Sequence, residues 1–286
     1  NLYNTASPNI EDCIIRNNQA IYPDPSGQWA AGYGGGISGD AYTGTIKNVL
    51  INNNKAKYGS AINIGGTSIV NINNCTFANN TNDYGGDIYF DGQSGGLTAN
   101  ITNSIIWDDS IGVYSTTTVN VSHSIVQGGY TGTGNLDVNP KFVKVITTGD
   151  EESDYHLSDW SPAIGAGATT GAPTTDIEGN PRPNPTGSSP DMGAFENKWG
   201  TPQNAPPVIA TQSDLTIAED GTSTATLTAT DANDDAITYS AVSDTNAVTV
   251  SVSSSTLTLT PNLNWNGVAN IKAYASDGTF KDSTTF

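Results

Sequence analysis

The last third of the sequence carries carboxylate and amide side chains of the kind that bind metal ions. Asp231, Asn233 and Asp235 occupy alternate positions, and Glu219 and Asp277 lie in two other segments rich in turn-forming residues. Calcium takes about six to eight hard oxygen ligands, which such side chains supply. If the three segments are loops at one end of a β-sandwich, they predict a calcium site that rigidifies the domain. The alternative interpretation is that they are solvated turn residues.

A second candidate site is aromatic. Residues 19–32 interrupt a repeat described below, and Trp29 and Tyr33 lie in or beside this insertion. Insertions in repeat proteins emerge as loops, often on the binding face. Aromatic rings offer rigid apolar area with a polar tip, so Trp29 and Tyr33 could stack on a sugar ring. The alternative is that they cover the end of a coil.

Catalytic chemistry on an acidic polysaccharide needs a basic residue near acidic groups or a metal. The candidates do not gather on one face of the predicted repeat, and Asp108-Asp109 takes the place that Asn79-Asn80 has in another copy. We interpret His156 and Arg182 as structural ion-pair or capping residues. The charged candidates in the repeats are Arg16, Lys47, Lys55, Lys57, Asp83, Asp87, Asp108 and Asp109.

The charged candidates in the first half of the chain are positioned by a repeat of nine residues. Each copy has an aliphatic first position, a polar third position, a large apolar sixth position and a final pair drawn from Asn, Asp and Gly. Short, β-branched segments broken by Gly and Asn favour the stacked coils of a parallel β-helix over helical repeats. The copies are residues 10–18, 46–54, 72–80, 101–109 and 121–129.

Stacking the copies predicts columns of side chains. The first and sixth positions are apolar and are expected to face inward: Ile10, Ile46, Ile72, Ile101 and Val121, and Ile15, Ile51, Phe77, Ile106 and Val126. The third position predicts a tight corner with stacked amides, because Asn and Asp tolerate a left-handed backbone. The corner residues are Asp12, Asn48, Asn74, Asn103 and His123, where a corner role for His123 is favoured over a catalytic base. A further column joins Tyr33, Tyr58 and Tyr84.

Composition narrows the class of protein. The 286 residues carry a net charge of −18, and only 13% are charged. This charge excludes partners such as nucleic acid and anionic membrane surfaces and favours cations. No apolar run approaches the ~20 residues that cross a bilayer, so no membrane insertion is predicted for this chain. With one Met, Met192, and no signal peptide, we expect a secreted or cell-surface protein of which this is a processed or excerpted piece.

The two cysteines, Cys13 and Cys75, fall in one column with Val49 between them. Two rungs of about 4.8 Å separate their Cα atoms by about 9.6 Å, beyond the roughly 7 Å that a disulfide allows. Both are expected to be free and buried.

Four segments after residue 129 resemble the C-terminal part of secreted bacterial right-handed β-helix proteins of the pectate-lyase-like, choice-of-anchor type. The resemblance implies that this tail closes the open end of the β-helix. The elements around Gly85, Ile88 and Phe77 also resemble repeats of polymorphic outer-membrane proteins. The four segments are residues 135–143, 154–167, 176–182 and 191–196.

Beyond a Pro-rich stretch, apolar residues alternate with Thr and Ser in about seven short segments, which indicates an antiparallel β-sandwich. This part resembles cadherin-like and immunoglobulin-like repeats of bacterial surface proteins, and the resemblance implies that Asn204 joins the calcium ligands. Such modules usually complete one more strand, so a C-terminal truncation is expected. The matching segments are residues 204–207, 218–221, 229–235, 264–267 and 275–278.

The sequence therefore predicts an all-β chain with a right-handed parallel β-helix at residues 1–196, a linker at 197–207 and an antiparallel, cadherin-like or Ig-like β-sandwich at 208–286. We favour a non-catalytic secreted or cell-surface structural or adhesion protein whose β-helix is a stalk or ligand platform. Expected partners are an extracellular polysaccharide or cell-surface component. Two alternatives stay open: a polysaccharide lyase or glycoside hydrolase acting on an acidic polysaccharide, and a self-associating filament subunit.

Overall fold

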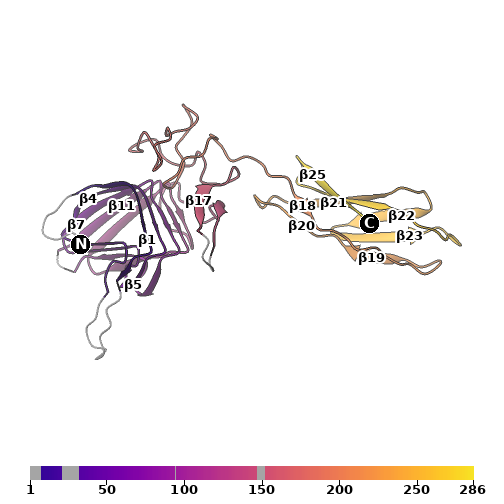
Figure 1. Cartoon of the computed structure of the whole chain (residues 1–286), viewed down its shortest axis with the longest axis horizontal. Helices are drawn as coiled ribbons and strands as arrows, with labels where there is room; N and C mark the ends of the chain where they lie inside the picture. The colour runs from indigo at the N-terminus through magenta and orange to yellow at the C-terminus, as the bar shows by residue number, and fades with distance from the viewer. Residues whose placement is uncertain (1–7, 21–31, 94, 147–151) are drawn as a thin grey trace, which may run out of the picture. The chain divides into compact units, whose positions relative to one another are not determined.

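The computed structural model describes residues 8–20, 32–93, 95–146 and 152–286. The chain divides into two compact units, Asn1–Gln203 and Asn204–Phe286 (Figure 1). The described residues form strands, turns and loops and no helix, as predicted for an all-β protein. The predicted linker is split by this division, since residues 197–203 fall in the first unit and residues 204–207 in the second.

The first unit is built from three parallel sheets, to which successive coils of the chain contribute strands in turn (Figure 1). The largest contains β1 (Ile10–Arg16), β4 (Thr43–Asn52), β7 (Ser68–Asn73), β8 (Thr76–Ala78), β11 (Leu97–Thr102), β12 (Ile105–Trp107), β14 (Thr117–Ser122) and β15 (Ile125–Val126). The second contains β3 (Ile37–Asp40), β6 (Ile62–Gly65), β10 (Ile88–Asp91) and β13 (Ile111–Tyr114). The third contains β2 (Gln19–Ala20), β5 (Lys55–Tyr58) and β9 (Thr81–Tyr84). Such stacked parallel coils are a β-helix.

The register of the large sheet is the one predicted from the repeat. Ile72 pairs with Ile46 on one side and with Ile101 on the other, and Phe77 pairs in the same way with Ile51 and Ile106. The apolar columns line the interior, where all members are buried except the partly buried Ile10 and Ile15 of β1, the outermost strand. Stacking therefore buries the apolar face that one coil could not bury alone.

The predicted corner column is also confirmed. The backbone φ angles are 53° at Asp12, 52° at Asn48, 49° at Asn74, 52° at Asn103 and 47° at His123, all in the left-handed region. The amides bond along the column, with the Nδ2 of Asn48 donating to the Oδ1 of Asp12 at 2.9 Å and the Nδ2 of Asn103 to that of Asn74 at 3.3 Å. His123 is thus a corner residue.

The tail after residue 129 does more than close the end of the coil. Leu136 pairs with Ile125 and covers the last rung, as expected. The rest, including the hairpin of β16 (Phe142–Lys144) and β17 (Asp154–Leu157), packs along the outer side of the coils. Leu157 and Met192 of the tail form one buried apolar cluster with Ile105 and Ile125 of the large sheet, separate from the interior core. The outer face of this sheet is therefore a second buried layer, which the sequence analysis did not anticipate.

Both cysteines are free, as predicted. Cys75 is fully buried, and burial raises the pKa of its thiol to about 12. The prediction of burial is wrong for Cys13, which is partly exposed because β1 has a neighbouring strand on only one side among the described residues.

The second unit contains antiparallel sheets that enclose one apolar core, formed by residues such as Leu227, Leu257, Leu259 and Ile271. The sheets are β18 (Val208–Ile209) with β20 (Ala229–Thr230), then β19 (Ser223–Thr226) with β23 (Thr256–Pro261) and β22 (Val248–Ser253), and β21 (Thr238–Ser243) with β24 (Ile271–Ser276) and β25 (Lys281–Thr285). The predicted alternation is observed, since Leu257 and Leu259 are buried and Thr256 and Thr260 are exposed.

Candidate functional site

The tyrosine column predicted from the sequence forms a stack on the β-helix. Tyr58 pairs in register with Tyr33 and with Tyr84, and its ring centroid lies 5.3 Å from that of Tyr33 and 5.8 Å from that of Tyr84. Tyr33 is 49% exposed and Tyr84 is 59% exposed. Large apolar side chains at these exposures present their rings to solvent, so the stack is an accessible aromatic surface.

A fourth ring, Tyr89 of β10, extends this surface, and its centroid lies 5.8 Å from that of Tyr58. It fits because Gly85 leaves room, since a Cβ atom there would lie 2.7 Å from the Tyr89 ring. The Nζ of Lys57 lies 5.8 Å from the centroids of both Tyr58 and Tyr84, within the range of a cation–π interaction. We call Tyr33, Tyr58, Tyr84 and Tyr89 the tyrosine stack.

Polar side chains adjoin the tyrosine stack. Asn63 pairs in register with Tyr89, and Ser38 pairs with Asn63. Burial, and then the nearby charge of Asp91, raise the pKa of the Tyr89 phenol. Among the described residues, no hydrogen bond is made by the phenol oxygens of the stack. Asn63 is itself buried. The surface therefore combines ring faces with free hydroxyl groups.

The sequence analysis identified Tyr33 in this surface and did not single out Tyr89 or Asn63. The signal for Tyr89 was present, since Ile88 and Phe90 on either side of it are buried and alternation turns Tyr89 outward. The other predicted sugar-binding residue, Trp29, lies outside the described residues.

The second candidate site lies in the second unit, where five of the six predicted calcium ligands come together. The Nδ2 of Asn204 lies 3.0 Å from the Oδ2 of Asp277, and the Nδ2 of Asn233 lies 3.0 Å from the Oδ1 of Asn204 and 2.6 Å from the Oδ2 of Asp235. The Oδ1 of Asp231 accepts hydrogen bonds from the backbone amides of Asn233 and Asp235. We call these five residues the oxygen cluster.

One oxygen of the cluster has no partner. The Oδ2 of Asp231 is buried and accepts no hydrogen bond. A buried carboxylate oxygen without a donor is costly, and a cation is one way to satisfy it. The donor chemistry fits calcium, since the cluster offers carboxylate and amide oxygens. Across the described ranges no three His, Cys, Asp or Glu side chains are grouped to hold a metal ion, so a calcium site here needs the oxygens of Asn204 and Asn233 as well.

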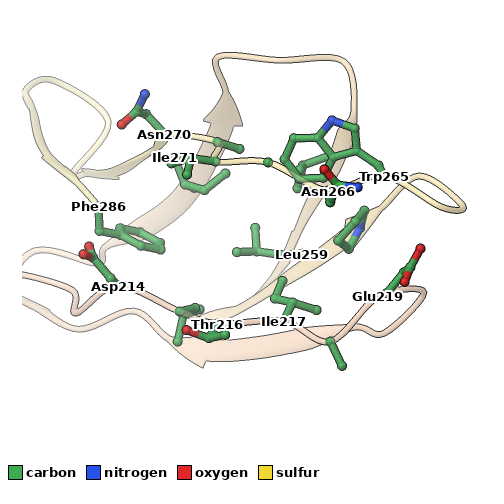
Figure 2. Close-up of a pocket in the computed structure, with 17 residues that line it drawn as sticks. Asp214, Thr216, Ile217, Glu219, Leu259, Trp265, Asn266, Asn270, Ile271 and Phe286 are labelled. Carbon is green, nitrogen blue, oxygen red and sulfur yellow. The ribbon is translucent and has the colours of Figure 1, made fainter.

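The structure does not bring Glu219 to the oxygen cluster. Glu219 lines the same end of a groove near the start of β24 as Trp265 and Asn266 (Figure 2), whereas Asp277 directly follows the end of β24. The length of that strand separates Glu219 from the other five predicted ligands. The prediction of one shared site is therefore corrected for this residue.

The charged residues of the coils make structural contacts. Asp109 accepts two hydrogen bonds from Asn80, and Asp87 accepts hydrogen bonds from the hydroxyl groups of Ser60 and Ser110. Lys47 lies 3.0 Å from Glu11, and Arg16 pairs with Glu152. These contacts give four of the charged candidates a structural role.

The interpretation of Arg182 and His156 as structural residues is supported by their contacts. Arg182 pairs with Glu196 at 2.8 Å with both side chains fully buried, and it donates to the Oδ1 of Asn48 at 2.9 Å. His156 lies between Asp154 at 2.5 Å and Glu178 at 3.2 Å. The ion pairs join the tail to itself, and the hydrogen bond from Arg182 to Asn48 joins it to a coil corner.

Residues 204–285 match the family model for a bacterial Ig domain. No curated protein and no solved structure matches the chain. The second unit is thus a bacterial Ig domain, a kind of domain typically exposed at the cell surface. No helix among the described residues is long and apolar enough to cross a membrane.

Proposed function

We propose that this chain belongs to a secreted or cell-surface adhesion or structural protein, and that its β-helix binds an extracellular polysaccharide through the tyrosine stack. The observation that supports this most directly is the exposed stack of Tyr33, Tyr58 and Tyr84 in consecutive coils. Neighbouring coils are separated by about 4.8 Å, a spacing at which rings repeat along a line. A polysaccharide chain that lies along the coils would meet several rings.

The charge of the protein favours a neutral polysaccharide. The net charge is −18, and Asp91 acts on the pKa of Tyr89 in the stack itself. An anionic polymer would be repelled by this charge at low ionic strength. Lys57 is the one cation that contacts the described rings of the stack, and it lies over two of them. Aromatic faces with free hydroxyl groups suit neutral sugar rings.

We further propose that calcium binds the oxygen cluster and rigidifies the Ig domain. The support is the convergence of Asn204, Asp231, Asn233, Asp235 and Asp277, together with the unpartnered Oδ2 of Asp231. Calcium would replace the amide-to-carboxylate hydrogen bonds that now hold these side chains, and its ligands would come from three separate segments.

Affinity electrophoresis in gels that contain neutral or acidic polysaccharides tests the proposed function. The expected result is retardation by at least one neutral polysaccharide and no retardation by a matched acidic polymer without calcium. The same polysaccharides are then incubated with the protein and assayed for new reducing ends and for unsaturated uronate absorbance. Turnover of any of these polysaccharides would contradict a purely binding function and favour the alternative, a lyase or hydrolase.

A filament subunit is the remaining alternative. Light scattering over a hundredfold range of protein concentration distinguishes it from a monomeric binding protein. A size that grows with concentration, without polysaccharide, would favour self-assembly through the strand edges.

A further inference from the structure

The large sheet of the β-helix has an outer face whose side chains are in register across the coils. Within each strand every second residue points outward, because the residues between them, such as Val70 and Ile72 of β7, are buried in the interior. Strand pairing places the outward residues of β4, β7, β11 and β14 in columns. Two of these columns, which we call the Thr/Asn face, are Thr43, Ile69, Thr98 and Thr118, and Thr45, Asn71, Asn100 and Asn120.

The Thr/Asn face is open to solvent. Its exposed members are Thr43, Ile69, Asn71, Thr118 and Asn120, and its other members are partly exposed. The tail buries the outer side of this sheet beyond the corner, at strands β12 and β15. Before the corner the tail reaches the neighbouring column, where the Nδ2 of Asn73 donates to the carbonyl of Gly171. The exposures show that the tail borders the Thr/Asn face and does not cover it.

The side chains of the Thr/Asn face are held in fixed orientations. The Nδ2 of Asn100 donates to the Oδ1 of Asn71 at 2.9 Å, and the Nδ2 of Asn120 donates to the Oδ1 of Asn100 at 2.9 Å. A side-chain amide has two N–H donors and an oxygen with two lone pairs, so each of these residues keeps groups that can bind water. The column that begins at Thr43 is β-branched throughout, and such side chains are stiff at χ1. The face therefore presents donors, acceptors and methyl groups at set positions.

The chemistry of the Thr/Asn face favours an uncharged ligand. Its residues carry no charge and no aromatic ring, although the net charge of the chain is −18. Lys47, in the neighbouring column, is paired with Glu11 at 3.0 Å. An ion would find no opposite charge on the face, and a sugar ring would find no aromatic ring to stack on, in contrast to the tyrosine stack. The face therefore suits a ligand that bonds through O–H groups and tolerates methyl groups.

The spacing of the Thr/Asn face favours a ligand that is itself periodic. Neighbouring strands of a sheet lie about 4.8 Å apart, and alternate residues along one strand lie about 6.6 Å apart. The face thus repeats its hydroxyl, methyl and amide groups in two directions. Ice is an uncharged solid whose water oxygens repeat in two directions with periods of similar size. Water molecules held by the side chains of the face can therefore take positions that continue into an ice lattice.

We propose that the Thr/Asn face binds ice. Its hydroxyl, amide and methyl groups hold a layer of water molecules in lattice order, and this layer joins the surface of an ice crystal. Because the side chains are already fixed, binding costs little conformational entropy. This activity is adhesion to ice. It does not depend on the tyrosine stack, whose rings belong to the other two parallel sheets and to Tyr33 beside them.

The test uses the full chain in an ice-incorporation assay, in which ice grows slowly from a dilute solution and takes up proteins that bind it. We expect the wild type to enter the ice and to show thermal hysteresis, while serum albumin stays in the liquid. Thr98→Tyr and Thr118→Tyr place a bulky ring in the water layer, so both should lose incorporation. The matched control Thr81→Tyr makes the same change at an exposed position of β9, in another sheet, and should enter the ice like the wild type. Tyr58→Ala should also enter the ice.

Exclusion of the folded wild type from ice would overturn the proposal. Undiminished incorporation of Thr118→Tyr, shown to be folded by circular dichroism, would also overturn it, and this exposed position decides the matter even if Thr98→Tyr does not fold. Loss of incorporation in Thr81→Tyr or Tyr58→Ala would move ice binding to another surface. Crystalline cellulose and chitin are tested in a pull-down. Binding to either solid that Thr118→Tyr removes, without uptake of the wild type into ice, would make a crystalline polysaccharide the ligand of this face.

Discussion

The Nδ2 of Asn80 donates to the Oδ2 of Asp109 at 2.7 Å in the interior of the β-helix. This bond is the last in a row of side-chain hydrogen bonds that runs from coil to coil, which we call the ladder. In the preceding step of the row, the Oδ1 of Asn80 accepts hydrogen bonds from the backbone amide and the side-chain amide of Asn54. Asn80 and Asn54 each donate to a carbonyl of the preceding coil, at Ile51 and Ile15. Asp109 carries a carboxylate at the position where the three preceding copies of the repeat have the amides of Asn18, Asn54 and Asn80.

The first prediction concerns this carboxylate. Burial, and then the charge of Asp87, raise the pKa of Asp109 well above its ordinary value. The folded state thus favours the protonated carboxyl, and ionising it costs folding stability. This cost is absent below the unfolded pKa of about 3.9, where the carboxyl is protonated in both states. It grows as the pH rises from there through the folded pKa, and it is complete above that value. Asp109→Asn should therefore raise the melting temperature more at pH 8 than at pH 4. If Asp109→Asn and the wild type melted at the same temperature at pH 4 and also at pH 8, this account of Asp109 would be contradicted.

Arg182 provides the second prediction. Its partner Glu196 is fully buried, and burial raises the pKa of this carboxyl while Arg182 opposes that shift. Arg182→Met should destabilise the β-helix unit by about 3–5 kcal/mol, because it leaves a buried carboxylate unpaired. Lys198→Met is the control, since its bond to Asp159 is exposed and worth at most about 1 kcal/mol. Urea unfolding measures both, and similar losses for the two variants would refute a structural role for the buried pair.

The third prediction tests the register of the coils. Ile51 is fully buried, and Ile69 of β7 is 51% exposed. Ile51→Asp should prevent stable folding, since a buried unpaired carboxylate is very costly. Ile69→Asp should change stability by less than about 1 kcal/mol. Thermal unfolding followed by circular dichroism separates them, and an Ile51→Asp variant that melts like the wild type would mean that the register is wrong.

The fourth prediction concerns calcium. Millimolar calcium should raise the melting temperature of the Ig domain, with a gain of about 2.7 kcal/mol at a hundredfold excess over the dissociation constant. Magnesium should substitute poorly because it requires a tighter octahedron. Asp231→Ala should abolish the response, and Glu219→Ala should keep it because Glu219 lies outside the oxygen cluster. No response in protein first freed of metal would leave the cluster as hydrogen-bonded turn residues.

The coil columns were predictable from the sequence because the repeat itself encodes the register. The residue type of Asn74 is enough to predict the left-handed corner, and the spacing of Ile72 and Phe77 is enough to predict that both side chains are buried. The contact between Arg182 and Asn48 was not predictable, since it joins residues 134 positions apart across a tail without a repeat.

The misplacement of Glu219 has a simple physical origin. The segment of β19 and β20 runs between Glu219 and Asp231, so the two residues lie at opposite ends of it. One passage along the sandwich moves the chain from one end to the other. The residue types in a loop do not show at which end that loop lies. Asp231, Asn233 and Asp277 lie near one another because β21 to β24 return the chain to the same end.

The most direct test of the polysaccharide-binding account is calorimetric titration of the tyrosine variants with an oligosaccharide of the polymer that retards the protein. Tyr58→Ala and Tyr84→Ala should each weaken binding at least about tenfold, whereas Tyr58→Phe should keep most of the affinity because the ring face remains. Phe280→Ala, which removes a 43% exposed ring from the Ig domain, is the matched control and should bind like the wild type. Wild-type affinity in Tyr58→Ala and Tyr84→Ala would contradict the assignment of the tyrosine stack as the binding surface.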